Sequence, residues 1–176
     1  MSLYDDICEH AIGNYGLVTT AQAEALGVER KDIGEWVTLG RLEKLGRGVY
    51  RIAHYLPSEY DRYAEAVALV GGDAAVWGES VLAMHNLALV NPLKVTVAVG
   101  RRVRKVLPEW IKLENLPGHA TIDVFNGIRC QNLASAIREA KGSMLAERLA
   151  EAVREAERRE LLRIGEAEKL KKEFAI

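Results

Sequence analysis

Residues 16–51 read GLVTTAQAEALGVERKDIGEWVTLGRLEKLGRGVYR, and this stretch decides the fold of the N-terminal part of the chain. Thr19, followed three residues later by Gln22, is typical of a capping box at the start of a helix. A short helix is therefore predicted over residues 20–26, ending at Gly27. We expect its buried side chains to be Ala21, Ala25 and Leu26.

A second helix and a hairpin follow directly. The second helix is predicted from about Arg30 to Leu39, with Ile33, Trp36 and Val37 on its buried face. Beyond Gly40 the apolar period changes, so residues 42–45 and 49–52 are predicted to be two strands joined at Gly46-Arg47-Gly48. Tyr50 is expected to pack this hairpin onto the second helix rather than to stack on a base. Together with a helix over residues 3–13, this order predicts a winged helix-turn-helix.

The remaining residues predict a second domain with mixed structure. A linker at 54–58 is followed by helices at 59–70, 80–87 and 133–141, and by strands at 94–99, 111–116, 121–125 and 128–130. Asn126-Gly127 is expected to form the hairpin turn between the last two strands, and Asn132 to cap the helix 133–141. Ser143 is expected to cap a long charged helix that ends near Ile164, with a short helix over 166–174. The expected fold class is α+β, with a winged helix in residues 1–53 and a mixed α/β domain in residues 59–176.

The charges restrict how such a chain can bind a polyanion. The formal net charge is −1, so nucleic-acid binding has to depend on local groups of cations. In a winged helix the second helix of the motif enters the major groove, and the wing contacts the backbone or the minor groove. The expected DNA-contacting residues are Thr19, Thr20, Arg30, Lys31, Arg41, Lys44, Arg47 and Arg51.

Two features leave alternatives open. Arg30 and Lys31 can instead pair with Asp32 and Glu35 on a solvated helix face, because residues 29–40 carry a net negative charge. A second basic group, Arg101, Arg102, Arg104 and Lys105, can contact DNA phosphates, bind RNA or an acidic partner, or form a solvated loop.

The residues do not predict catalysis, a metal site or a cofactor. The four histidines lie in unrelated contexts without metal-ligand spacing, and no hydrolase or phosphate-loop motif is present. Cys8 and Cys130 are expected to be reduced, buried thiols. The acidic N-terminus and the absence of a long apolar run predict a cytoplasmic protein that does not enter a membrane.

Several short runs resemble a known family. The N-terminal part of the chain is similar to the N-terminal domain of AbiEi-type antitoxins. The similarity is carried by residues 16–23, Gly27, Gly40-Arg41-Leu42 and residues 47–51. These are transcriptional regulators of bacterial abortive-infection systems. A weaker similarity to the family's C-terminal domain runs through residues 80–83, Leu87, Pro92, the strand 95–99 and Arg101-Arg102.

This resemblance implies a non-enzymatic repressor of its own operon that binds double-stranded operator DNA. It also implies an antitoxin that counteracts a nucleotidyltransferase-like toxin encoded beside it, without requiring direct contact. The family's DNA-contact positions correspond to Arg30, Lys31, Arg47 and Lys44. The acidic Glu29 and Asp32 and the long charged C-terminal helix depart from the family pattern, and that helix leaves a homodimer open.

Two rival functions remain on the residues alone. One is a protein-interaction module whose winged helix no longer binds DNA. The other is a small nuclease, which is disfavoured because the chain lacks the acidic-lysine pattern of such enzymes.

Overall fold

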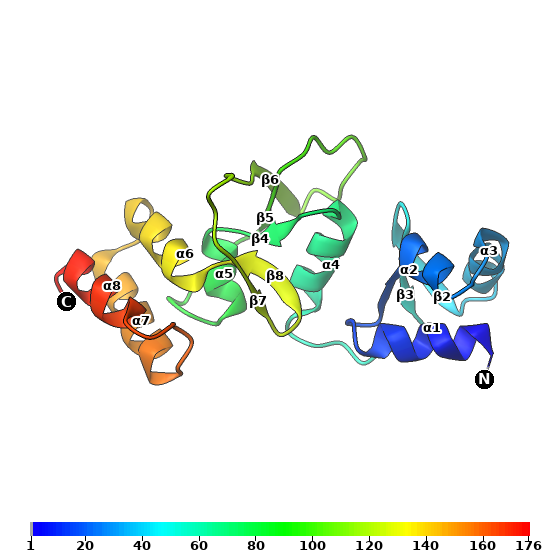
Figure 1. The fold of residues 1–176 in the computed structure, drawn as a ribbon, viewed down its shortest axis with the longest axis horizontal. Coiled ribbons are helices and arrows are strands. Elements are labelled where there is room, and N and C mark those ends of the chain that lie inside the picture. Colours follow the sequence, from blue (N-terminus) through cyan, green and yellow to red (C-terminus); the bar gives the residue numbers. More distant parts are fainter. Residues whose placement is uncertain (1) are drawn as a thin grey trace. The chain divides into compact units, whose positions relative to one another are not determined.

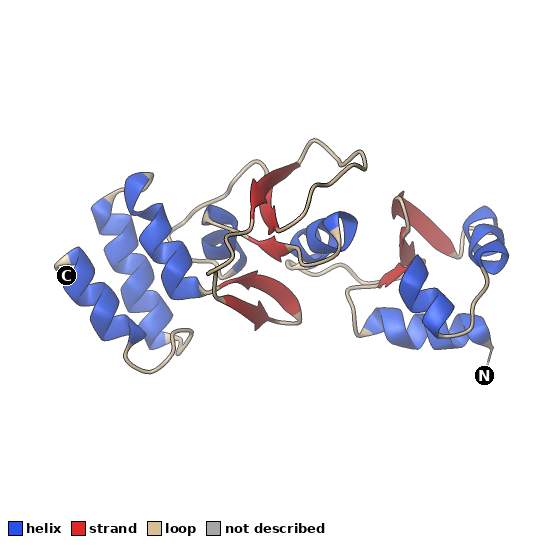
Figure 2. Ribbon diagram, turned by 45° about the horizontal axis from the view of Figure 1, so that its top comes forward, coloured by secondary structure: helices blue, strands red, loops and turns tan. Residues whose placement is uncertain are grey.

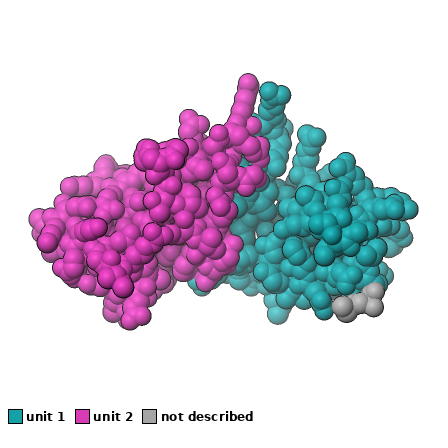
Figure 3. All heavy atoms as spheres, viewed as in Figure 1, with its two compact units in different colours: residues 1–71, 103–107 teal, residues 72–102, 108–176 magenta. Residues whose placement is uncertain are grey.

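The computed structural model describes residues 2–176, which form two compact units (Figure 3). Of the described residues, unit 1 comprises 2–71 and 103–107, and unit 2 comprises 72–102 and 108–176. The expected α+β class is confirmed, because both units combine helices with a sheet (Figure 2).

Unit 1 begins with the predicted winged helix (Figure 1). Its helices are α1 (Leu3–Ile12), α2 (Thr20–Ala25) and α3 (Arg30–Thr38), and its strands are β1 (Leu17–Thr19), β2 (Leu42–Gly46) and β3 (Val49–Ile52). The strands form an antiparallel sheet in the order β1-β3-β2. The three helices and the β2–β3 hairpin thus follow the predicted order.

The capping box at the start of α2 is confirmed. The Thr19 hydroxyl accepts a hydrogen bond from the Gln22 backbone N–H, and Gln22 Oε1 accepts one from the Thr19 N–H. The predicted buried face of α2 is wrong, however, because Ala21, Ala25 and Leu26 are exposed. Ala23 is the buried residue of α2 instead, and it packs in the core cluster of the winged helix. A helix of six residues buries only one narrow face, and Ala23 lies on it.

The core of the winged helix joins α1, the sheet and both helices of the motif. Its buried side chains are Ile7, Ala11, Val18, Ala23, Val28, Ile33, Leu42 and Ile52. Trp36, Val37 and Tyr50 are partly buried and pack against this cluster. The side of α3 that carries Ile33 is therefore fixed to the core, and its opposite side faces solvent.

The helix α4 (Asp61–Val70) is also part of unit 1. Leu69 lies so close to Gly46 of β2 that a Cβ atom added to that glycine would be 2.5 Å from Leu69 Cδ2. Asp61 accepts a hydrogen bond from the Tyr55 hydroxyl. The compact unit therefore extends to Gly71, whereas the sequence suggested a boundary within residues 54–58.

Unit 2 contains a five-stranded mixed sheet. Its strands are β4 (Ala75–Val76), β5 (Val95–Val99), β6 (Ile111–Asn115), β7 (Ile122–Phe125) and β8 (Ile128–Gln131). They lie in the order β6-β5-β4-β8-β7, with the pairs β5–β6 and β4–β8 parallel. Asn126 and Gly127 both have positive φ at the β7–β8 turn, as the dipeptide predicted.

The helices of unit 2 are α5 (Glu79–Met84), α6 (Leu133–Glu139), α7 (Ala146–Arg158) and α8 (Glu166–Phe174), with a short 3₁₀ turn, η1 (Ala140–Gly142). Asn132 caps α6 as predicted, because its side chain accepts the Ser135 N–H. The short helix expected over residues 166–174 is present as α8.

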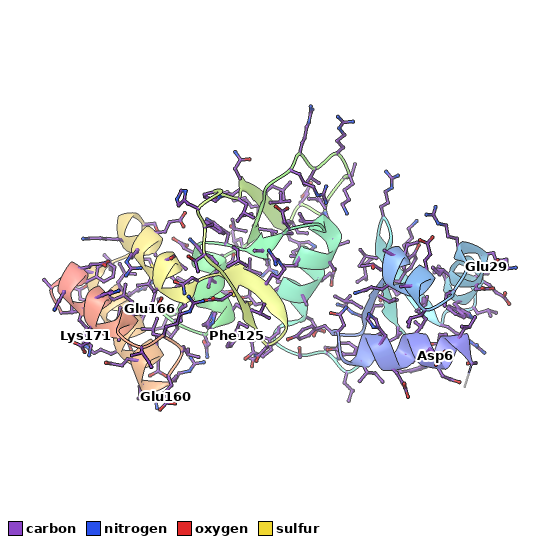
Figure 4. All side chains as sticks on the ribbon, in the orientation of Figure 1. Asp6, Glu29, Phe125, Glu160, Glu166 and Lys171 are labelled. Carbon is purple, nitrogen blue, oxygen red and sulfur yellow. The ribbon has the colours of Figure 1, made fainter. Side chains whose placement is uncertain are left out.

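The predicted long helix from Ser143 to Ile164 is wrong. The Ser143 hydroxyl donates to Glu79 rather than capping α7, and α7 ends at Arg158. Glu160 and Gly165 then adopt positive φ, which reverses the chain before α8. Lys171 of α8, which is labelled in Figure 4, forms an ion pair with Glu157 of α7 over 2.7 Å. The apolar face of α7 is covered in this way, with Leu149, Val153 and Leu170 buried.

Among residues 2–176, no helix is both long and apolar enough to cross a membrane.

Candidate nucleic-acid interface

A solvent-open hollow of about 330 Å³ lies on unit 1 between the start of α2, the start of α3 and the β2–β3 wing. It is lined by Thr20, Arg30, Ile33, Lys44, Arg47, Gly48 and Tyr50. The fold therefore brings together four of the predicted DNA-contacting residues, which lie up to 27 positions apart in the sequence. We call this concavity, with its lining residues, the basic hollow.

The backbone holds the wing against α2 at this point. The Thr20 N–H donates to the Gly48 carbonyl over 3.0 Å. Gly48 has a φ of +73°, and a Cβ atom there would lie 3.3 Å from Thr20 Oγ1. The positive φ therefore favours glycine at this position, and any larger residue would also crowd the Thr20 hydroxyl. The tip residue Arg47 takes its place beside the hollow because of this contact.

Lys44 and Tyr50 face each other across the wing. They are register partners, and the pairing shifts between Lys44 and Gly46, so that Leu45 forms a β-bulge. Tyr50 packs on the core, as expected, but also lines the basic hollow. The wing thus supplies one aromatic and two cationic side chains to a single concave surface.

The basic hollow differs from the whole chain in charge. Its lining includes the cations of Arg30, Lys44 and Arg47, and within the described residues no carboxylate is part of that lining. The formal charge of the whole chain is only −1. A local group of cations in a concave surface attracts phosphate groups even where the net charge does not.

The two cations at the start of α3 are each paired with a carboxylate. Arg30 Nε donates to Glu24 Oε1 of α2 over 2.7 Å, and Lys31 Nζ lies 3.0 Å from Glu29 Oε2. Figure 4 labels Glu29 directly before α3. Both cations therefore form ion pairs on an exposed face, as the alternative reading expected, but their partners are Glu24 and Glu29 rather than Asp32 and Glu35. Asp32 instead accepts the Glu29 backbone N–H, within the first turn of α3.

Thr19 and Arg41 lie outside the lining of the basic hollow. The Thr19 hydroxyl accepts the hydrogen bond that caps α2. Arg41 is exposed at the start of β2, where its Cζ lies 5.2 Å from the centre of the Tyr4 ring and its carbonyl accepts the Tyr4 hydroxyl. Both residues belong to the same unit, but neither shares the concave surface.

Arg51 is held inside the unit. Its Nη2 lies 3.1 Å from Glu65 Oε2 of α4, and both side chains are only 19% exposed. Its Cζ also lies 6.0 Å from the centre of the Tyr55 ring. We therefore assign Arg51 to the attachment of α4 to the sheet and leave it out of the proposed DNA contacts.

The solvent side of α3 contains a glycine in the middle of the helix. Lys31, Gly34, Glu35 and Thr38 are exposed, and a Cβ atom at Gly34 would meet nothing within 4 Å. Gly34 does not have positive φ, so neither the backbone nor the packing requires glycine there. Its absent side chain leaves the surface of α3 low between Lys31 and Thr38.

The second basic group follows β5. Gly100 donates its N–H to the Asp73 carboxylate at the start of this loop, and Arg101 Nε lies 2.6 Å from where a Cβ of Gly72 would be. Arg102 and Arg104 are exposed. The predicted solvated loop and its cations are thus present, and which partner they contact stays a prediction.

The remaining polar candidates are used in packing. Cys8 and Cys130 are free thiols, and Cys8 is only half-buried. Burial raises the pKa of the Cys130 thiol to about 12, so it stays protonated at neutral pH. Among residues 2–176, no group of three or more histidine, cysteine or carboxylate side chains gathers in a way that would hold a metal ion.

Two members of the site were missed at the level of sequence. Tyr50 was expected only to pack the wing, because a single aromatic residue in a strand does not distinguish packing from exposure. Glu24 was not singled out, because its partner Arg30 lies six positions away across a turn and follows no helical spacing rule. A charge on the last turn of α2 and another on the first turn of α3 would have been the signal to examine.

Three helices, a three-stranded sheet and a basic wing define the winged helix-turn-helix class. Residues 5–53 match the model of a family described as transcriptional regulator, AbiEi antitoxin, which confirms the resemblance over that segment. A comparison of the chain with curated proteins finds no match.

Proposed function

We propose that the protein is a DNA-binding transcriptional regulator of the AbiEi antitoxin type. The observation that carries this proposal is the basic hollow, which lies within the segment that matches the regulator family. Its cations come from both parts of a winged helix that contact DNA, the recognition helix and the wing.

The proposed contacts divide into two kinds. Arg30, at the first position of α3, enters the major groove and contacts a guanine through two parallel hydrogen bonds. Lys31, Lys44 and the Thr20 hydroxyl contact phosphates, which set the position of the domain on the duplex. Arg47, at the exposed tip of the wing, contacts the backbone or the adjacent minor groove.

We also propose a finer role, which follows from the resemblance of the sequence to AbiEi-type antitoxins. The protein represses its own operon and counteracts a nucleotidyltransferase-like toxin encoded beside it, by binding rather than by catalysis. Direct contact with the toxin is not required. If the regulator acts as a homodimer, the centres of the two half-sites are expected to lie one helical turn, about 34–36 Å, or a multiple of that distance apart.

The basic segment of Arg101, Arg102, Arg104 and Lys105 is proposed as a secondary phosphate contact. Each phosphate that it neutralises releases counterions and steepens the dependence of binding on salt. It adds affinity without sequence preference.

Gel-shift titrations of the full chain with the DNA upstream of its own gene, over a range of salt concentrations, test the proposal. Arg30→Ala is expected to weaken binding about tenfold or more and to relax the sequence preference, because a bidentate base contact is lost. Arg47→Ala is expected to lower the slope of log K against log salt by about one.

The matched control is Arg154→Ala, which removes an exposed arginine from α7 of unit 2 and should leave both quantities unchanged. Failure of the wild type to bind, or equal binding by all three variants, would contradict the regulator role. Co-expression with the neighbouring gene separately tests the antitoxin role, which requires that the protein restore growth when that gene product is toxic.

A further inference from the structure

The ion pair between Glu24 and Arg30 has an unusual position for a surface contact. It joins the end of α2 to the start of α3, and Arg30 also lines the basic hollow. The side chains are 44% and 79% exposed, and exposed pairs of this kind contribute little to folding. Stability therefore does not explain a carboxylate held 2.7 Å from the arginine best placed to contact DNA.

The geometry of the contact matters more than its strength. A guanidinium group presents N–H donors from Nε and from its two terminal nitrogens in a rigid plane. Glu24 accepts from Nε, so this bond does not use the Nη1–Nη2 end. That end carries the pair of donors that match O6 and N7 of guanine.

We propose that Glu24 is a positioning residue that holds Arg30 for end-on recognition of a guanine. This inference rests on the proposed function, because it gives Arg30 a DNA partner. A guanidinium fixed at Nε loses less conformational entropy when it binds. The binding free energy therefore becomes more favourable for the duplex with the correct base than for any other duplex. Glu24 thus increases sequence preference without touching the DNA.

The proposal makes a prediction opposite in sign to that of simple charge repulsion. A carboxylate near a phosphate backbone weakens binding to every duplex, so its neutralisation should strengthen all binding alike. If Glu24 positions Arg30, its neutralisation instead reduces the preference for the correct sequence. The two effects are separated by comparing a preferred duplex with a scrambled one.

The experiment uses the full chain and a duplex selected by the wild type from a random pool. Fluorescence anisotropy gives the Kd of the wild type, Glu24→Gln, Arg30→Ala and the double variant for the selected and the scrambled duplex. Glu24→Gln is expected to reduce the ratio of the two affinities about fivefold, and to have no further effect in the Arg30→Ala background. Replacing the contacted guanine by 7-deazaguanine, which lacks the N7 acceptor, should abolish the effect as well.

Glu43→Gln is the charge-matched control, because Glu43 is an exposed carboxylate on β2 of the same unit, and it should leave the ratio unchanged. Thermal unfolding of Glu24→Gln should match that of the wild type. An unchanged ratio in Glu24→Gln, or an equal effect with and without Arg30, overturns the positioning role while leaving DNA binding intact. A wild type that selects no duplex overturns the proposed function itself.

Discussion

At the scale of single residues, the cations of unit 1 fall into two groups with different tasks. Arg51 is largely buried and paired with Glu65, whereas Arg30 and Arg47 are exposed beside the basic hollow. The sequence alone does not separate these groups, because all three are arginines within the same winged-helix segment. Only the packing of α4, which supplies Glu65, distinguishes Arg51 from the others.

Gly34 gives a test in which stability and binding change in opposite directions. Glycine in the middle of a helix costs about 0.5–1 kcal/mol relative to alanine, and nothing in the structure requires it at this position. Gly34→Ala is therefore expected to raise the free energy of unfolding by that amount. If α3 lies against DNA, the added methyl group should at the same time weaken binding.

Urea unfolding and anisotropy titrations measure the two quantities on the same samples. Ala25→Gly, in the exposed last turn of α2, offers the reverse change away from the surface of α3. A Gly34→Ala protein that is stabilised and binds DNA as well as the wild type would show that this part of α3 does not approach the duplex.

At the scale of elements, α4 and the wing are joined by an ion pair that we expect to stabilise unit 1. Glu65→Gln leaves the Arg51 guanidinium partly buried without its charged partner. Because hydrogen bonds to charged groups contribute about 1.5–3 kcal/mol, the variant should lose an amount in that range. Chemical denaturation measures the loss, and hydrogen exchange should show faster amide exchange in β3.

The comparison for this variant is Glu114→Gln in unit 2. Glu114 pairs with Lys112 over 2.8 Å, but the lysine is 59% exposed. Exposed pairs contribute little, so this change should stay within about 0.5 kcal/mol of the wild type. Equal effects of the two substitutions would mean that α4 is not held by Arg51.

Short sequence signals predicted where helices and turns begin and end better than they predicted which distant residues and strands come into contact. Helix caps and tight turns depend on only a few neighbouring residues. The cap of α2 by Thr19 and Gln22, the cap of α6 by Asn132 and the turn at Asn126-Gly127 were therefore predicted correctly. Ser143 failed as a cap because its hydroxyl is bonded to Glu79, 64 positions earlier. The order β6-β5-β4-β8-β7 likewise depends on long-range pairing that no local pattern specifies.

The candidate site shows the same limit. Arg30, Lys44 and Arg47 were predicted because the winged-helix pattern assigns those positions to the recognition helix and the wing. Thr20 was predicted because it stands at the N-terminus of the helix before the recognition helix. The contributions of Tyr50 and Glu24 depend on how the wing folds over α3 and how α2 meets α3. Side-chain contacts across such turns have no fixed sequence spacing.

At the scale of the whole molecule, acid stability should depend on a buried histidine of unit 2. His85 lies with its ring centre 4.0 Å from that of Phe125, and its Nδ1 is 2.8 Å from the Val81 carbonyl. Since a carbonyl only accepts, Nδ1 carries the proton of a neutral ring. Burial lowers the pKa of His85, with the nearby Arg159 acting in the same direction.

The sign of the pH dependence follows from this lowered pKa. Below the unfolded pKa of about 6.5, the unfolded chain binds a proton that the folded chain does not, so stability falls as the pH decreases. The slope reaches at most about 1.4 kcal/mol per pH unit, until the folded pKa is reached. Denaturation at pH 7, 6 and 5 measures it.

His85→Gln should flatten this dependence between pH 7 and 5, because glutamine does not titrate. His54→Gln, at an exposed histidine in unit 1, should leave it as in the wild type. Identical pH profiles for the wild type and His85→Gln would show that another group governs acid unfolding.

Arg51 is largely buried and paired within the fold, whereas the other cations are exposed, and this difference affects how the sequence of such a protein can change. Substitutions at exposed positions usually change stability by no more than about 0.5 kcal/mol. Arg30, Lys31 and Arg47 can therefore be exchanged during evolution, or by an engineer, while the core and the Arg51–Glu65 pair keep the scaffold folded. If these cations make the proposed DNA contacts, new operator preferences are accessible by single substitutions, each of which passes through a folded protein.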